Sequence, residues 1–345
     1  MSRIVRYNKL STGLREVFGC RVQRVAVDGG FTCPNRDRTV GVGGCIYCDE
    51  AGSRAAYVEP TLPIREQVRR GIERMRRRYK AEKFLVYFQP YTNTYAPVER
   101  LRALYDEALD HPDVVGLMIG TRADCLGHRS RRGKEAECEK MDNLRPETVR
   151  LLTSAATTPK TGCQPVLQLL EEYHRRTYLW VELGLQSVND ETLRWIGRGH
   201  DLAPFERGAR EAKARGLRLC AHLIVGLPTD RREDHLAAAE LLNRLGFDGV
   251  KIHSLYVSRN APLGAMFERE PFDLMTRREY VERVCDILER LDPRIVIHRL
   301  ASDADARTLI APDWCLDKRG VVADIEAELE RRGTREGCRM GESGL

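Results

Sequence analysis

Short apolar runs alternate along the chain with segments whose apolar residues recur every three to four positions. The runs are continuous, which is typical of strands covered on both faces, as in parallel sheets. The segments with helical spacing predict the helices that provide this cover. We expect strands at residues 25–27, 84–88, 114–119, 178–183, 217–225, 249–257 and 295–298.

The helical segments have recognisable faces and start signals. The first is marked by apolar residues at helical spacing: Ile64, Val68, Ile72, Met75 and Tyr79. Capping-box pairs predict two later starts, Asp230 with Glu233 and Thr276 with Glu279. Further helices are expected at residues 98–110, 165–176 and 320–332, and from residue 190.

Strict alternation of strands and helices predicts an α/β protein with a parallel sheet. Six such units fit an incomplete (β/α)6-type barrel with a C-terminal strand/helix extension, and the site would lie at the carboxyl ends of the strands. We divide the chain into a basic N-terminal arm (1–24), a partial barrel (25–260) and a C-terminal extension (261–345). Residues 127–163 are charged and then rich in Ser, Thr and Pro, which indicates an insertion with a short helix at 146–152.

Charge and composition narrow the class of protein. The 345 residues include 11 cysteines, no apolar stretch long enough to span a membrane and no apolar leader. We therefore expect a cytoplasmic protein whose cysteines serve metal binding or catalysis. Residues 1–83 carry 18 Lys and Arg against nine Asp and Glu. This asymmetry favours an anionic partner such as RNA, although a solvated arginine-rich helix face explains it equally well.

A glycine-rich loop after the first strand carries three cysteines, Cys33, Cys45 and Cys48, spaced C-x11-C-x2-C. A structural zinc site uses four ligands, and ordinary [4Fe–4S] clusters also use four cysteines. A cubane held by three cysteines leaves one iron open, the arrangement of enzymes that cleave S-adenosylmethionine (SAM). The alternative is three unrelated buried thiols.

In such a barrel, polar residues just past the strands would face the cofactor. Gln89, Tyr91 and Thr92 follow the second strand, and Gly226 and Tyr256 follow the fifth and sixth. The end of the fourth strand supplies four more candidates: Glu182, Gln186, Ser187 and, twelve residues beyond Gln186, Arg198.

The chain resembles radical SAM proteins of the YhcC/YtqA type, which are related to the Elongator catalytic subunit and to oxygen-independent coproporphyrinogen oxidase. The resemblance is carried by these stretches: Tyr7–Ser11, Gly30–Asp37, Tyr87–Pro97, Gly120–Leu126, Arg176–Ser187, Arg198–Asp201, Ala221–Pro228, Gly249–His253 and Leu309–Pro312. The chain departs from the family pattern at the insertion, at Pro90 and at 301–305.

This resemblance implies a radical SAM barrel with a [4Fe–4S] cluster on Cys33, Cys45 and Cys48, and SAM on the open iron. By the coproporphyrinogen-oxidase pattern, Gln186 and Arg198 would contact SAM. The resemblance further implies modification of a tRNA base, at the wobble uridine, and a reductant such as flavodoxin or ferredoxin.

Three alternatives stay open. A metal-dependent barrel hydrolase could use His222, His253, His298 and Asp303, and a non-enzymatic RNA-binding module would need only the basic region. A second cluster on the remaining cysteines lacks a Cys-x-x-Cys pair. Substrate-facing candidates are Arg6, Tyr7, Arg36, His298, Arg299, Trp314 and Lys318.

Overall fold

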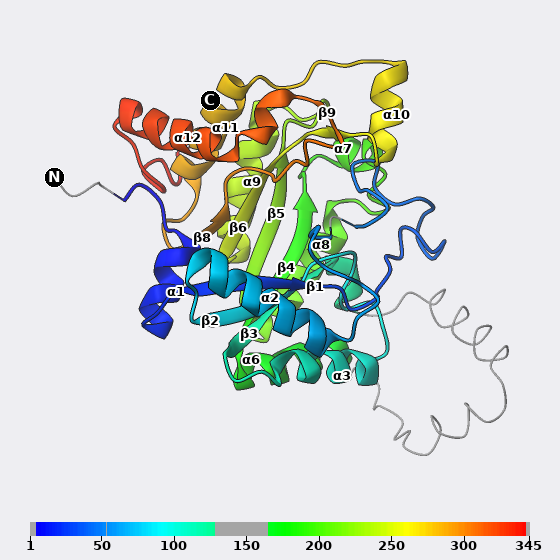
Figure 1. Ribbon diagram of the computed structural model, residues 1–345. Helices are drawn as coiled ribbons and strands as arrows, with labels where there is room; N and C mark the ends of the chain where they lie inside the picture. The colour runs from blue at the N-terminus through cyan, green and yellow to red at the C-terminus, as the bar shows by residue number, and fades with distance from the viewer. Residues whose placement is uncertain (1–4, 53, 128–164, 343–345) are drawn as a thin grey trace.

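The computed structural model describes residues 5–52, 54–127 and 165–342, and its centre is one parallel sheet (Figure 1). Seven strands lie in the order β1-β2-β3-β4-β5-β6-β8, so β1 and β8 are open edges and the sheet forms a half-barrel. The strands are β1 Val22–Val27, β2 Lys83–Phe88, β3 Val114–Thr121, β4 Tyr178–Gln186, β5 Leu219–Val225, β6 Gly249–Ser254 and β8 Val296–Arg299. All of their carboxyl ends lie at one edge, here called the carboxyl edge.

Helices cover the outer face of this sheet, as the continuous apolar strands require. Outward residues such as Val25, Val86 and Val181 are fully buried against them. The covering helices are α2 Ile64–Tyr79, α3 Val98–Leu109, α6 Pro165–Arg176, α8 Leu202–Ala214, α9 Arg232–Leu245, α11 Arg277–Arg290 and α12 Lys318–Arg332, the last packed on α11. The predicted α/β half-barrel is therefore confirmed, with β8 as a seventh strand of the same sheet.

Helix α1 (Leu10–Phe18) lies in the segment that we expected to be a basic arm. Leu10 and Leu14 are buried with Trp180 and Met118 on the inner face, at the amino-terminal end of the strands. The helix contacts both β1 and β8, and the Ile297 amide donates to the Asn8 carbonyl at 2.7 Å. α1 therefore bridges the two open edges of the half-barrel.

Short elements cluster at the carboxyl edge. β7 (Val257–Ser258) pairs antiparallel with β9 (Leu309–Ala311), and α10 (Pro262–Arg269) follows β7. Two short 3-10 helices lie at Ala123–Cys125 and Asp313–Leu316. Leu263 and Leu227 are buried in an apolar cluster here, separate from the outer core.

The region after β4 holds two helices where the periodicity predicted one. α7 (Asp190–Trp195) begins at Asn189, whose Oδ1 accepts from the Glu191 amide at 2.9 Å. It ends because Gly197 and Gly199 adopt φ values of 64° and 77°, in the left-handed region that favours glycine. α8 then begins at Leu202.

The two predicted capping boxes have different outcomes. At α11, the Thr276 amide donates to Glu279 Oε2 at 2.8 Å, as expected. At α9, the pair is shifted by one residue, because the Arg231 amide donates to Asp234 Oδ2 at 2.8 Å. Asp230 is instead buried beside other side chains, as described below.

The insertion 127–163 and its helix at 146–152 lie outside the described residues, apart from Gly127, and the domain boundaries stay predictions. In the described part of the chain, no helix is long and apolar enough to cross a membrane.

Candidate active site

The three cysteines lie in the loop that leaves β1 at the carboxyl edge. Cys45 is buried, and Cys33 and Cys48 are partly buried. The Asn35 side-chain amide donates to the Gly197 carbonyl at 2.6 Å and approaches Cys45 Sγ at 3.5 Å. Asn35 therefore links the cysteine loop to the turn between α7 and α8.

Two glycines make room for Asn35. A Cβ at Gly41 would lie 2.2 Å from Asn35 Oδ1, and a Cβ at Gly199 would lie 2.6 Å from the same atom. Real Cβ atoms do not approach so closely, so the fold of the loop depends on glycine at both positions.

The Cys45–Cys48 turn is held from both sides. The Cys48 amide donates to the Cys45 carbonyl at 2.9 Å, which closes the turn. The Ile46 amide donates to Ile196 at the end of α7, at 3.0 Å, and the Ile46 carbonyl accepts from Leu263 of α10, at 2.8 Å. Backbone groups thus fix both faces of this turn.

Arg36 and Tyr91 support the loop beside Cys48. Arg36 Nη2 donates to the Cys48 carbonyl at 3.0 Å and to the Asp49 carbonyl at 2.5 Å, and its guanidinium lies 5.3 Å from the Tyr91 ring centroid. The Tyr91 hydroxyl donates to the Glu50 carbonyl. Burial raises the pKa of the Cys48 thiol to about 11, while Arg36 opposes that rise. An electropositive ligand on the sulfur would further favour the thiolate.

The spacing of the sulfur atoms tests which metal group fits. Thiolates on one tetrahedral zinc lie about 3.8 Å from one another, given Zn–S bonds of about 2.3 Å. In the described chain, only Glu182, Cys220 and His298 form a three-ligand group with all ligand atoms within 4.8 Å. The three loop cysteines do not form such a group, so at least one pair of their sulfur atoms lies more than 4.8 Å apart, wider than a single zinc ion needs. Three cysteine thiolates are donors that suit an iron–sulfur cluster.

The end of β4 lies next to this loop. Arg198, which is buried, donates from Nη2 to the Gly184 carbonyl at 2.7 Å. Gln186 has φ of 70°, and its side-chain amide lies over Gly184, where a Cβ would come within 2.6 Å of Nε2. The pKa of Tyr47 is raised by burial and by Cys45 and lowered by Arg198, which places that guanidinium beside the cysteine turn. The structure thus brings Gln186 and Arg198 together near the cysteines.

The loop after β2 packs between β3 and the cysteine loop. The Thr92 amide donates to Thr32 at 3.2 Å, and Thr92 Oγ1 is buried without a hydrogen-bond partner in the described part of the chain. The Gln89 amide donates to the Val27 carbonyl at 3.4 Å. Both residues therefore lie at the carboxyl edge, as predicted.

Gly226 and Tyr256 also lie at this edge. Gly226 follows β5 with φ of 102°, a conformation that excludes ordinary side chains. Burial raises the pKa of Tyr256, and the charge of Asp49, the residue after Cys48, contributes next.

The Ser187 side chain contacts the buried carboxylate of Asp230. Its hydroxyl donates to Asp230 Oδ1 at 2.7 Å, and Thr192 Oγ1 donates to the same oxygen at 2.5 Å. Burial raises the pKa of Asp230 to about 6, although both hydroxyls oppose the rise. Ser187 therefore fastens the end of β4 to the loop before α9, and its cofactor contact stays a prediction.

Glu182 lies before the end of its strand, because β4 continues to Gln186. Glu182 lies inside the strand, fully buried, where Oε2 accepts from Lys251 Nζ and from His222 Nε2, the latter at 2.9 Å. Its other oxygen lies 3.7 Å from His298 Nδ1. Lys251, His222 and His298 thus surround this carboxylate, which lies deeper in the half-barrel than the carboxyl ends of the strands.

Most of the substrate-facing candidates contact other parts of the protein. The Tyr7 hydroxyl donates to Glu326 of α12 at 3.1 Å, and the Trp314 indole donates to the Met275 carbonyl at 3.1 Å. Arg6 donates to the Thr334 carbonyl at 3.0 Å. Arg36 braces the cysteine loop and His298 is fully buried, as described above.

Arg299 and Lys318 share one partner. Arg299 donates to Asp303 at 3.0 Å, and Lys318 donates to both oxygens of that carboxylate at 2.7 Å.

The sequence profile of the Radical SAM superfamily matches residues 39–242, and that of the Radical SAM C-terminal domain matches residues 247–331. The chain therefore belongs to the radical SAM superfamily of enzymes, which use a [4Fe–4S] cluster with SAM and need a reductant. This excludes a metal hydrolase or a purely RNA-binding module as the main activity.

Within the superfamily, the chain is 36% identical over 332 residues to the uncharacterized protein YtqA of Bacillus subtilis, which covers 96% of this chain and 92% of that protein. It is 32% identical over 329 residues to protein YhcC of Escherichia coli, covering 95% of this chain and 94% of that protein. The resemblance given by the motifs is thereby confirmed.

More distant matches cover part of larger proteins. A tRNA uridine(34) acetyltransferase of Methanocaldococcus infernus is 24% identical over 272 residues, 73% of this chain and 48% of that protein. The structure of Elp3 from the same organism, lacking N-terminal residues, matches with a TM-score of 0.60 at 18% identity, covering 92% of this chain and 65% of that chain. The structural match shows a shared fold.

The sequence did not reveal two functional candidates, and it suggested a different role for a third. Asn35 lies within a matching motif, but its approach to Cys45 depends on the turn after α7. Arg122 donates to the Arg198 carbonyl at 2.9 Å and to Asp124, which only the folded chain brings together. His222 was considered as a metal ligand, and its pairing with Glu182 depends on the register of β4 and β5.

Proposed function

We propose that Cys33, Cys45 and Cys48 hold the [4Fe–4S] cluster of this radical SAM enzyme, and that the substrate is a tRNA base, the wobble uridine. When bound, the cluster supplies the electron that cleaves SAM into methionine and a 5′-deoxyadenosyl radical, which abstracts hydrogen from the substrate. The observation that supports the ligand assignment is the loop at the carboxyl edge, braced by Asn35 and by the two glycines that enclose it.

The proposed SAM contacts are the residues that converge beside this loop. Arg198, held against Gly184, presents a buried cation, which suits the carboxylate of the methionine group. Gln186 offers an amide next to it, and Gln89 and Thr92 offer polar atoms across the sheet. Gly226 allows close approach of a ligand to the backbone, because it has no side chain. Tyr256, which follows β6, offers a hydroxyl at the same edge.

Support for tRNA comes first from the relatives. The tRNA uridine(34) acetyltransferase shares 272 aligned residues with this chain. Arg24 adds partly exposed positive charge on the inner face of the half-barrel, where a polyanion would approach the site. Arg299 and Lys318 share the single carboxylate of Asp303, which leaves one excess positive charge there.

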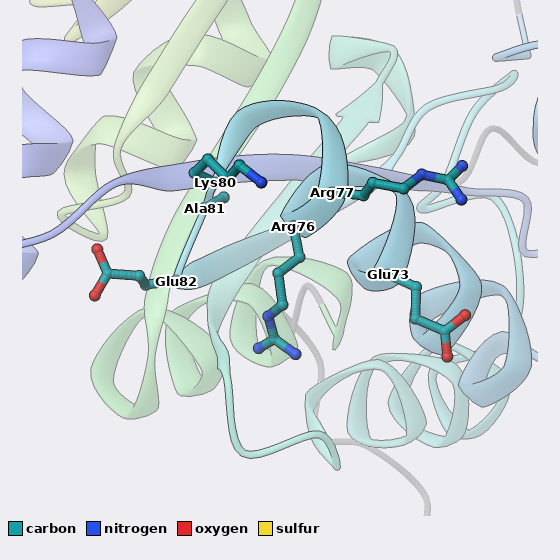
Figure 2. Close-up of a pocket in the computed structure, with 6 residues that line it drawn as sticks. All are labelled: Glu73, Arg76, Arg77, Lys80, Ala81 and Glu82. Carbon is teal, nitrogen blue, oxygen red and sulfur yellow. The ribbon is translucent and has the colours of Figure 1, made fainter.

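The arginine-rich helix α2 contributes less than its composition suggests. Arg69 and Arg70 pair with Glu66 at 2.7 Å, and Arg76 pairs with Asp113 at 2.6 Å. Figure 2 shows Arg76 and Arg77 pointing in different directions around a shallow hollow lined by Glu73, Lys80, Ala81 and Glu82. Because α2 runs back from the carboxyl edge, this hollow lies at the opposite end of the sheet from the cysteines.

A reduced flavodoxin or ferredoxin is the proposed electron donor. Cys33 and Cys48 are only partly buried, so the cluster would lie near the surface at the carboxyl edge.

The substrate half of the proposal is tested with reconstituted protein, SAM and dithionite without oxygen. We expect bulk tRNA to stimulate the formation of 5′-deoxyadenosine and to show a mass change confined to the wobble uridine. tRNA that has first been digested with ribonuclease is the control. Equal stimulation by the digest, or none by intact tRNA, rules out tRNA as the substrate.

A further inference from the structure

His222 is paired with a buried carboxylate on the inner face of the half-barrel. Its Nε2 lies 2.9 Å from Glu182 Oε2, and its side chain retains 19% exposure while that of Glu182 has none. Since Glu182 accepts the Nε2 proton, the other ring nitrogen, Nδ1, carries a lone pair. The described residues provide no hydrogen-bond partner for Nδ1, which solvent reaches.

Buried side chains also fix the Glu182 carboxylate in place. Lys251 donates to Glu182 Oε2, is only 2% exposed, and lies 4.2 Å above the Tyr87 ring. His298, with no exposure, faces the second oxygen at 3.7 Å and packs edge-on against Trp180. Burial alone would raise the pKa of Glu182, but Lys251 and the two histidines hold it well below its usual range. Glu182 is therefore an ionised, immobile acceptor.

The strand register places His222 beside the proposed SAM contacts. His222 pairs with Gly184, whose carbonyl accepts from Arg198. Gly184 carries no side chain, so nothing on β4 screens the ring from the region of Gln186 and Arg198. On its other side, His222 pairs with Lys251.

The groups that face the ring favour its neutral form. Burial and then Lys251 lower the pKa of His222, with Glu182 opposing, and Arg299 of β8 lowers it further. The ring of His253 on β6 lies 5.2 Å away, and its own pKa is well below the usual range because of burial and Arg299. At neutral pH, His222 thus offers an uncharged acceptor.

We propose that His222 is a catalytic-site residue that binds the substrate: Nδ1 accepts a hydrogen bond from an N–H or O–H group beside the carbon that loses hydrogen, and Glu182 is its positioning residue. The proposal rests on the proposed function for the identity of the substrate, where the imide N–H of uracil or a ribose hydroxyl has this chemistry. The histidine itself is assigned from the geometry of this chain.

The residues around Glu182 do not form a second metal site. Glu182, Cys220 and His298 bring their ligand atoms within 4.8 Å of one another, but the Lys251 ammonium already neutralises the carboxylate. A divalent cation would have to displace that buried charge.

The solvent accessibility of the His222 ring can be tested without any substrate. Diethyl pyrocarbonate, which acylates neutral and accessible imidazoles, is added to the reconstituted protein, and modified peptides are mapped by mass spectrometry. We expect modification at His222 and none at His298, the matched histidine on the same carboxylate. An unmodified His222 overturns the proposal whether or not tRNA is the substrate.

The role is tested by His222→Gln and, as its control, His298→Gln. We expect His222→Gln to keep its iron content, and to lose roughly tenfold in tRNA-stimulated kcat/KM, the effect of one lost hydrogen bond. The tRNA-stimulated kcat/KM of the wild type should fall at low pH, where the His222 ring is protonated. The variant should not show this decrease.

The outcomes separate the two proposals. Equal losses in both variants, or an unchanged decrease at low pH in His222→Gln, show a structural role for His222 and overturn this inference. A wild-type enzyme that tRNA does not stimulate contradicts the proposed function, and the modification map then decides the inference about His222 alone.

Discussion

At the scale of single residues, the cysteine loop is shaped by side chains that carry no metal. Asn35 fills the space left by Gly41 and Gly199, and Arg36 spans the backbone after Cys48. The sequence could predict the three thiols because their spacing is local. It could not predict these supports, because the strands β2, β3 and β4 separate Asn35 from Gly199 in the sequence.

Glu182 shows the opposite case. Its position near the end of an apolar run suggested a ligand contact, yet β4 continues for four residues beyond it. An apolar pattern does not mark where a strand ends when polar residues such as Gln186 continue it. The buried partners of Glu182, which come from β5, β6 and β8, are equally invisible in the pattern.

Gly184 provides a direct test of the SAM contacts. In Gly184→Ala, the new Cβ would lie 2.6 Å from Gln186 Nε2 and 2.9 Å from Arg198 Nη2, so both side chains must shift. We expect SAM affinity to fall roughly tenfold or more, because a hydrogen bond from a charged group is disturbed. Isothermal titration with SAM measures it, and iron content should stay at the wild-type level.

The matched control is Gly13→Ala in α1, where a Cβ has no neighbour within 4 Å. This variant should bind SAM like the wild type. If Gly184→Ala also retains wild-type affinity, Arg198 and Gln186 do not contact SAM.

At the scale of elements, the long periodic helices and the continuous strands were predictable, since each is specified by its own residues. α1 was missed because its buried residues Leu10 and Leu14 pack on the inner face of the sheet, which exists only once the strands have assembled. α7 and α8 were merged because the periodicity runs across Gly197 and Gly199, whose left-handed conformations interrupt it.

The bridging role of α1 predicts that the helix is required for stability. Leu14 is 3% exposed, so Leu14→Ala should lower the free energy of unfolding by about 2–4 kcal/mol. Val17 on the same helix is 58% exposed, and Val17→Ala should change it by less than about 0.5 kcal/mol. Urea denaturation measures both. A similar small effect in Leu14→Ala would show that α1 is not part of the cooperative core.

At the scale of the whole molecule, the charge asymmetry was a poor guide to the site. The basic N-terminal third includes α2, whose arginines largely pair with acids and whose far end lies away from the cysteines. Charges meet partners from distant parts of the chain, such as Lys9 with Glu326 at 2.6 Å, so a count along the sequence overstates the free positive charge.

Stability of the whole fold should depend on pH through buried histidines. Burial and then Arg283 lower the pKa of His235 to about 4, against about 6.5 in the unfolded chain. Between these values the unfolded state binds the proton and the folded state does not, so stability is lost as the pH falls from 6.5 towards 4. From pH 7.5 to 5.5, this histidine should cost roughly 1.4 kcal/mol.

The measurement compares wild type with His235→Gln by urea denaturation at both pH values. Asp230 and Glu336 have raised pKa values of about 6 and about 8 and act in the opposite direction. The difference between the two proteins removes the contribution of Glu336 and reports His235 together with Asp230, whose Oδ2 lies 3.7 Å from His235 Nε2. The wild type should lose roughly 1.4 kcal/mol more than the variant over this range. Parallel pH dependence would contradict a neutral, buried His235.

The central claim is that the three loop cysteines hold a cluster that cleaves SAM. The most direct measurement reconstitutes the protein with iron and sulfide without oxygen, adds dithionite and SAM, and quantifies 5′-deoxyadenosine by chromatography. Cys45→Ala is compared with Cys285→Ala, a buried cysteine on α11 outside the loop. We expect the nucleoside and about four irons per chain from wild type and Cys285→Ala, and neither from Cys45→Ala. A full iron content without 5′-deoxyadenosine in the wild type, or normal activity in Cys45→Ala, would contradict the account.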